Sequence, residues 1–163
     1  MRRLHIILIA ALALIVSDKA AAQRPVIGER APEFKAAAWL TEKPAEGRRA
    51  RLLVFFHSSS RETIDQLAML DDIAGKYDEK LDVVVIAREA EDKVKPLLLG
   101  YGADGEHTAH KYYVALDDAG KTFANFGVQY VPFSVLLDAR GRVLWIGNPA
   151  QLDDATLTKF VGN

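Results

Sequence analysis

The order of apolar and polar segments predicts an α/β fold in which helices flank a mixed central β-sheet. Two apolar runs, residues 52–56 and 81–87, have the Val, Ile, Leu and Phe content of strands that are buried on both faces. An amphipathic stretch, residues 61–77, lies between them and predicts a strand–helix–strand unit. Two more apolar runs around a turn at residues 138–141 predict an antiparallel hairpin near the C-terminus.

Before the buried strand at residues 81–87, the sequence predicts a lead-in, two strands and a long helix. Residues 23–33 are a polar, proline-containing lead-in, residues 34–40 predict a short strand, and residues 41–49 predict a loop with Pro44 and Gly47. Residues 61–77 predict a helix because apolar side chains recur along one side: Ile64, Leu67, Ala68, Ile73, Ala74 and Tyr77. Charged side chains occupy much of the other side: Asp65, Asp71, Asp72 and Lys76.

The strands on either side of this helix are expected to be parallel, with a right-handed crossover. After residues 81–87, residues 91–99 predict a helix, although Pro96 weakens that assignment. Residues 100–105 are rich in glycine and predict a loop, and residues 112–116 predict a strand.

The C-terminal part predicts two helices around the hairpin. Residues 121–126 form a short helix that Gly127 ends. Residues 133–137 and 143–146 are the two hairpin strands, and residues 152–161 are a closing amphipathic helix.

The first residues have the three parts of a secretory signal. Arg2 and Arg3 precede an apolar run at residues 4–16, and Ala20–Ala22 provide an A-x-A cleavage site. The apolar run is shorter than the roughly 20 residues of a membrane span. We therefore expect a signal peptide at 1–22 and one domain at 23–163, located in the periplasm or secreted, with no stable membrane span after cleavage. An uncleaved N-terminal membrane anchor is the alternative.

Composition limits the function classes that suit this chain. The formal net charge is −1, so the sequence lacks the basic excess of nucleic-acid-binding proteins, and we expect no nucleic-acid partner. Export permits disulfides, yet the chain contains no cysteine. Its stability must therefore come from packing.

Several short motifs follow one another in a fixed order. Residues 27–34 read IGERAPEF, residues 60–63 read SRET at the start of the long helix, and Val131 and Pro132 precede the first hairpin strand. A D-x-x-G turn follows at 138–141, and Ile146 begins the sequence IGNP. In this order and spacing the chain resembles the thioredoxin fold, specifically the exported TlpA/ResA-like, redoxin-type group. The resemblance implies a thioredoxin-like fold with a TlpA-type insertion between the second buried strand and the hairpin.

The resemblance also implies thiol–disulfide chemistry, which this chain cannot perform. Ser60 and Thr63 stand where the group has the cysteines of a C-x-x-C pair. There, a helix N-terminus lowers the pKa of the first cysteine so that it attacks as a thiolate. A serine hydroxyl does not ionise near neutral pH, and no other cysteine can substitute. We therefore expect a redox-inactive domain and favour a protein that is not an enzyme. Ser60 and Thr63 are then degenerate catalytic positions, and we expect no cofactor.

The serines before the helix admit three interpretations. Ser59 with Glu62 has the spacing of a capping box, which favours a capped helix start. A serine nucleophile with His57 as its base is the second, although no G-x-S-x-G motif accompanies it. Binding of an anion or of a partner's carboxylate at the helix N-terminus is the third.

The segment at residues 104–110 is a weak candidate for metal binding. His107 and His110 lie beside Asp104 and Glu106, but a complete ligand set is not evident. We therefore predict no metal site and interpret these histidines as solvated.

The loop before Pro132 is the predicted binding surface. The resemblance implies a cis peptide bond there and a preceding loop whose backbone groups face a bound peptide, which requires no sulfur. We predict binding residues at His57, Ser59, Ser60, Tyr130, Val131 and Pro132. Phe56 and Phe133 are further candidates, with core packing as their alternative.

The leading hypothesis is a non-catalytic module that binds an envelope protein or peptide. One alternative is a family-type thioredoxin or redoxin oxidoreductase by ancestry. Another is an enzyme or ligand binder that uses non-thiol chemistry near His57 and Ser60, and a third is a structural accessory domain.

Overall fold

Two apolar strands form the centre of the sheet in the computed structural model, which describes residues 24–47, 49–100, 110–117 and 119–162. They are β2 (Ala50–Phe56) and β3 (Leu81–Ala87), and they pair in parallel along their whole length. Burial on both faces explains why all of their residues except Arg51 and Asp82 are apolar. The predicted parallel pair is confirmed, and the expected signal at 1–22 lies outside the described residues.

Four shorter strands complete a mixed six-stranded sheet with the order β1-β4-β3-β2-β5-β6. They are β1 (Ala38–Trp39), β4 (Tyr113–Leu116), β5 (Phe133–Leu137) and β6 (Val143–Gly147). β4 is parallel to β3, whereas β5 is antiparallel to both β2 and β6. The hairpin is therefore confirmed. The strand expected at residues 34–40 is shorter than predicted, because only β1 pairs with β4.

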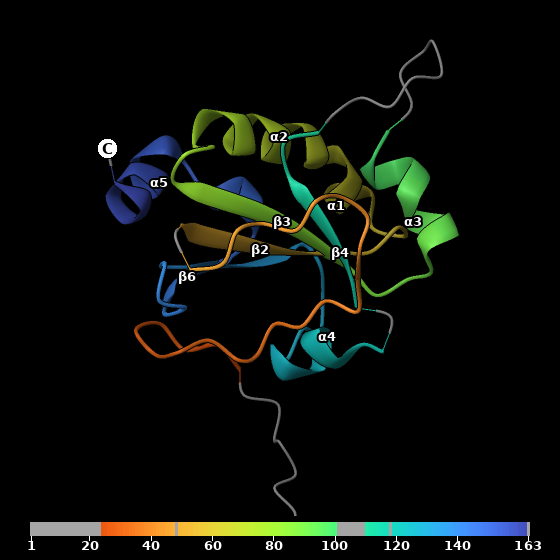
Figure 1. Cartoon of the computed structure of the whole chain (residues 1–163), viewed down its shortest axis with the longest axis horizontal. Coiled ribbons are helices and arrows are strands. Elements are labelled where there is room, and N and C mark those ends of the chain that lie inside the picture. The colour runs from red at the N-terminus through yellow and green to blue at the C-terminus, as the bar shows by residue number, and fades with distance from the viewer. Residues whose placement is uncertain (1–23, 48, 101–109, 118, 163) are drawn as a thin grey trace, which may run out of the picture.

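Helices cover both faces of this sheet (Figure 1). α2 (Leu67–Lys76), α3 (Glu91–Leu98) and α5 (Asp154–Val161) lie on one face, and α4 (Lys121–Asn125) lies on the other together with the lead-in. The segment between β3 and β5, expected to hold the insertion, contains α3, β4 and α4.

The single helix predicted at residues 61–77 is divided in two. α1 (Arg61–Asp65) ends before Gln66, and α2 begins directly after it. Backbone bonds still pass through this point, from Gln66 N–H to Glu62 O and from Leu70 N–H to Gln66 O. The Gln66 side chain is buried and donates to Asn148 Oδ1 at 3.0 Å. This contact with a distant turn accompanies the local departure from helical geometry, which periodicity alone did not predict.

The last helix begins later than predicted because a different residue caps it. Asp153 accepts the backbone N–H of Thr156 at 2.8 Å, so α5 starts at Asp154 instead of residue 152. A short 3-10 helix, η1 (Pro149–Gln151), occupies the preceding turn and was not predicted. The helix at residues 121–126 is confirmed as α4, and Gly127 follows it with a φ of 60°.

The sheet separates two apolar clusters. Leu70, Val94, Leu98 and Leu157 bring α2, α3 and α5 onto one face, and Phe123 and Phe126 bring α4 onto the other. The lead-in joins the second cluster through Phe34 and is hydrogen-bonded to β6, from Gly28 N–H to Val143 O. Trp39 and Trp145 are half-buried. No helix among the described residues is long and apolar enough to span a membrane.

Candidate functional site

The candidate site lies at the carboxyl ends of β2 and β3, beside the turn that precedes β5. Residues 57–60 connect β2 to α1, and the backbone N–H of Ser60 closes this turn on His57 O at 3.0 Å. The Val131–Pro132 peptide bond is cis, as the resemblance implied.

Ser60 caps α1, which corrects the predicted capping box. Its backbone is extended, and its Oγ accepts the backbone N–H of Thr63 at 3.4 Å. Because the helix starts at Arg61, Ser59 lies outside the cap and Thr63 occupies the third helical position. Glu62 instead accepts the Asn148 side-chain amide at 2.7 Å. The helix start is therefore serine-capped, but by Ser60 without a glutamate partner.

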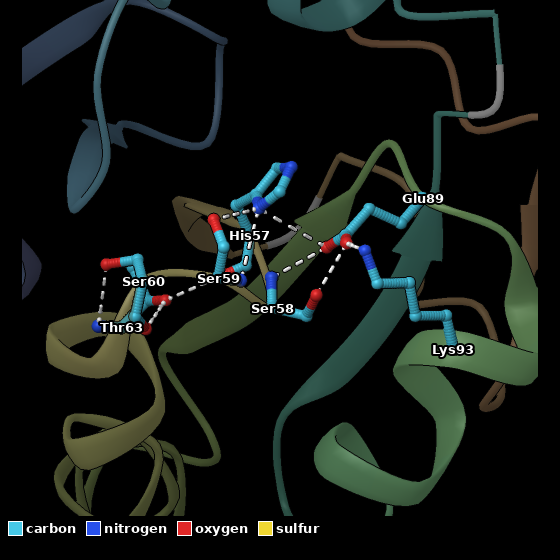
Figure 2. Close-up of polar contacts among 7 residues, drawn as sticks. All are labelled: His57, Ser58, Ser59, Ser60, Thr63, Glu89 and Lys93. Carbon is cyan, nitrogen blue, oxygen red and sulfur yellow. Dashed lines mark hydrogen bonds and ion pairs between the residues drawn. The ribbon is translucent and has the colours of Figure 1, made fainter.

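Thr63, the second degenerate position, is buried with only 2% of its surface exposed. Its hydroxyl lies 2.8 Å from Ser60 O and 3.1 Å from His57 O, so it can donate to either carbonyl. Both side chains at the cysteine positions are thus engaged inside the turn (Figure 2).

Among the residues that the structure describes, the His57 ring makes polar contacts through Nδ1 alone. Its Nδ1 accepts the backbone N–H of Ser59 at 3.2 Å and lies 2.8 Å from Ser59 Oγ. The same Nδ1 lies 3.9 Å from Glu89 Oε2. In a serine hydrolase the acid and the serine contact opposite ring nitrogens, so that the imidazole can move a proton between them. Here serine and carboxylate face the same nitrogen, which does not match that geometry.

Glu89 is the most heavily hydrogen-bonded side chain of the site (Figure 2). Its carboxylate is 8% exposed and accepts the backbone N–H and the hydroxyl of Ser58, each at 2.6 Å. Lys93, in the first turn of α3, lies 2.6 Å from the same group. Burial raises the pKa of Glu89, but the bonds from Lys93 and Ser58 and the nearby His57 outweigh it and lower the pKa to about 2. The charged Glu89 carboxylate, in the turn after β3, therefore links this turn through hydrogen bonds to Ser58 in the turn after β2.

A groove of about 230 Å³ opens beside this turn. Its polar lining is formed by His57, Ser59, Arg88 and Gln129, and its apolar lining by Phe123, Val128, Tyr130 and Val131. A second hollow of about 190 Å³ lies next to the groove, and Gln129 and Tyr130 line both. The Tyr130 side chain is 69% exposed and has an edge-on contact with Phe133. An exposed aromatic side chain thus borders two hollows.

Most of the predicted binding residues come together here, but not all line the groove. His57, Ser59, Tyr130 and Val131 line it. Ser60 is committed to the helix cap, and Pro132 is buried behind the loop. Phe56 is a core residue at 1% exposure, whereas Phe133 borders the second hollow.

Sequence reasoning missed Arg88, Glu89 and Lys93. Arg88 lines the groove with its guanidinium 5.3 Å from the centre of the Phe123 ring. The available signal was their position, since Arg88 and Glu89 directly follow the apolar run of β3. Polar residues at the carboxyl ends of parallel strands commonly form ligand sites.

The weak metal candidate falls on residues 104–110, of which the structure describes only His110. This ring stacks on Tyr112, and its Nδ1 lies 3.7 Å from Asp71 Oδ1. Within the described part of the chain, no group of three His, Asp or Glu side chains is placed to hold a metal ion.

Solved structures of thiol–disulfide proteins share this architecture. A candidate thiol:disulfide interchange protein DsbE from Chlorobium tepidum superposes with a TM-score of 0.65 at 22% identity, covering 85% of this chain and 99% of that one. The C-terminal domain of a candidate thiol-disulfide oxidoreductase from Bacteroides thetaiotaomicron has a TM-score of 0.57 at 18% identity, with 82% and 92% covered.

A third similar structure is the pneumococcal exposed lipoprotein thioredoxin from Streptococcus pneumoniae, with a TM-score of 0.56 at 20% identity over 70% of this chain and 84% of that one. No protein-family model and no curated protein matches the sequence. The chain therefore has a thioredoxin-like fold, as its motifs indicated, and it has no cysteine.

Proposed function

We propose that this chain is a non-catalytic, thioredoxin-like module that binds an extended segment of another protein. In this proposal residues 1–22 are a signal peptide, residues 23–163 form the working domain, and the domain acts in the periplasm or after secretion. An uncleaved N-terminal anchor is the alternative placement.

The proposal rests on Ser60 and Thr63, the two positions where the cysteines of a C-x-x-C pair would stand. Ser60 and Thr63 are bonded to each other within the helix start, and Thr63 is buried. Thiol–disulfide exchange requires a thiolate, and this chain has none to offer. The positions therefore support the turn instead of reacting with a substrate.

The groove beside this turn supports binding. Its loop, from Val128 to Val131, borders the groove and carries the exposed Tyr130 ring. Amphipathic aromatic rings of this kind commonly dominate protein interfaces. An extended segment crossing the loop would contact both hollows that Tyr130 borders.

The first test is chemical. The purified domain is assayed for insulin disulfide reduction and for peroxide turnover, with heat-denatured protein as the thiol-free control. We expect rates equal to the control in both assays. A rate above it in either assay would contradict the non-catalytic part of the proposal.

The second test is binding. An array of short synthetic peptides is probed with the wild-type domain and with Tyr130→Ala. Because loss of an interface aromatic commonly costs about 2 kcal/mol, we expect affinity for bound peptides to fall by tenfold or more. Leu97→Ala is the matched control, since it also removes an exposed apolar side chain, on α3. Peptide binding that Tyr130→Ala leaves unchanged would contradict the placement of the site.

A further inference from the structure

Two donor side chains, His57 and Arg88, stand next to each other at the ends of the central strands. Phe56 of β2 pairs with Ala87 of β3, so the residues that follow them occupy neighbouring positions on strands about 4.8 Å apart. Both line the groove. Arg88 lies over the Phe123 ring, which places it on the sheet face that α4 covers.

The Nε2 atom of His57 has no hydrogen-bond partner in the described part of the chain, and it is a donor in the neutral ring. Its Nδ1 accepts the Ser59 backbone N–H, which assigns the ring proton to Nε2. Figure 2 shows that this second nitrogen points away from Ser59 and Glu89. His57 therefore offers a donor to a ligand without releasing its existing contacts.

Arg88 has no acidic partner within the described ranges, where no carboxylate lies within ion-pair distance of it. Two described acidic residues at this end of β3 are committed elsewhere: Glu89 follows Arg88 in sequence, and the backbone N–H of Asp117 bonds to Ala87 O. Glu89 binds Ser58 and Lys93, and Asp117, beyond the paired end of β4, accepts the Phe123 backbone N–H at 2.9 Å. Arg88 thus brings to the groove a positive charge that no carboxylate of the described chain meets.

We propose that the groove recognises a partner segment that carries an aspartate or glutamate, whose carboxylate binds between the Arg88 guanidinium and His57 Nε2. This inference rests on the proposed binding function. Guanidinium–carboxylate pairs are short, charge-assisted and often bidentate, so they fix the position of the acidic residue. The apolar wall of Phe123, Val128 and Val131 excludes water from one side of the pair and strengthens it.

The test is a double-mutant cycle on synthetic peptides that bind the wild-type domain in a Tyr130-dependent way. Each Asp or Glu of such a peptide is replaced in turn by Asn or Gln, and the affinity is measured by fluorescence polarisation on wild type and Arg88→Gln. Arg140→Gln is the matched control, because Arg140 is an exposed arginine in the turn between β5 and β6.

We expect one acidic residue whose replacement weakens binding about tenfold on wild type and on Arg140→Gln, but has little effect on Arg88→Gln. Tyr130-dependent binding that is indifferent to acidic residues, or to Arg88→Gln, would overturn the carboxylate inference and leave the proposed function standing. Absence of any Tyr130-dependent peptide would overturn both.

Discussion

Glu89→Gln tests whether the buried Glu89 carboxylate stabilises the turn between β2 and α1. The wild-type carboxylate meets three donors at 2.6 Å, two from Ser58 and one from Lys93. A glutamine amide has a similar shape but offers one acceptor oxygen and no negative charge. The substitution therefore weakens this contact between the two strand ends without creating a cavity.

The size of the effect follows from the pKa of Glu89. A fall from 4.5 to about 2 corresponds to roughly 3 kcal/mol of folding stability at neutral pH, at about 1.4 kcal/mol per tenfold change. Lys93 is 58% exposed, so solvent weakens its share. We expect Glu89→Gln to lower the free energy of unfolding by about 2 kcal/mol at pH 7.

The pH dependence has a definite sign. Because the pKa is lower in the folded state, the stabilisation is fully present above pH 4.5 and is lost as the pH falls from 4.5 towards 2. The difference between wild type and Glu89→Gln should therefore shrink by about half or more between pH 7 and pH 3.

The assay is urea unfolding followed by tryptophan fluorescence at pH 7 and pH 3. Glu91→Gln is the matched control, because Glu91 also pairs with a lysine four residues later on α3, at 2.9 Å, but is 52% exposed. Exposed pairs contribute little, so we expect a change below about 0.5 kcal/mol for the control. Equal effects of the two substitutions, or a Glu89→Gln effect that does not depend on pH, would refute the reasoning.

Three further predictions concern the turn, the core and the exposed ring of Tyr130. Thr63→Val should lower the free energy of unfolding by only about 1 kcal/mol, because the two carbonyls that its hydroxyl contacts also accept backbone N–H groups. If urea unfolding shows no loss of stability, the hydroxyl is not engaged. Phe55→Ala should cost about 3 to 5 kcal/mol, because this fully buried ring packs against Phe123, Phe126 and Phe133. Tyr130→Ala should stay within about 0.5 kcal/mol of wild type, and a cost near that of Phe55→Ala would show that its ring is not a free surface group.

Much of the fold was predictable because burial leaves a direct trace in sequence. β2 and β3 are covered on both faces and therefore consist almost entirely of apolar residues, and the pattern of α2 and the D-x-x-G turn were equally visible. The division at Gln66 was not predictable, since it accompanies a hydrogen bond to Asn148, more than eighty residues away. The start of α5 differed for a local reason, because Asp153 caps it.

The candidate site was likewise predictable from the sequence only in part. The motif order placed Ser60 and Thr63 at the helix start, and the structure has them there. The sequence did not indicate that Ser60 rather than Ser59 is the cap, because that depends on the residue at which the chain turns. Arg88 and Glu89 carried no motif, and they join the site only because β3 lies beside β2 in the observed register.

The sequence by itself determined the class of fold and the loss of thiol chemistry, because apolar periodicity and the absence of a reactive atom are properties of the residues alone. Only the tertiary structure decided which polar side chains face the groove and which are used to hold it. Glu89 is committed to Ser58 and Lys93, whereas Arg88 and His57 line the groove. That distinction depends on strand register and on short distances between residues far apart in the chain, which no local pattern encodes.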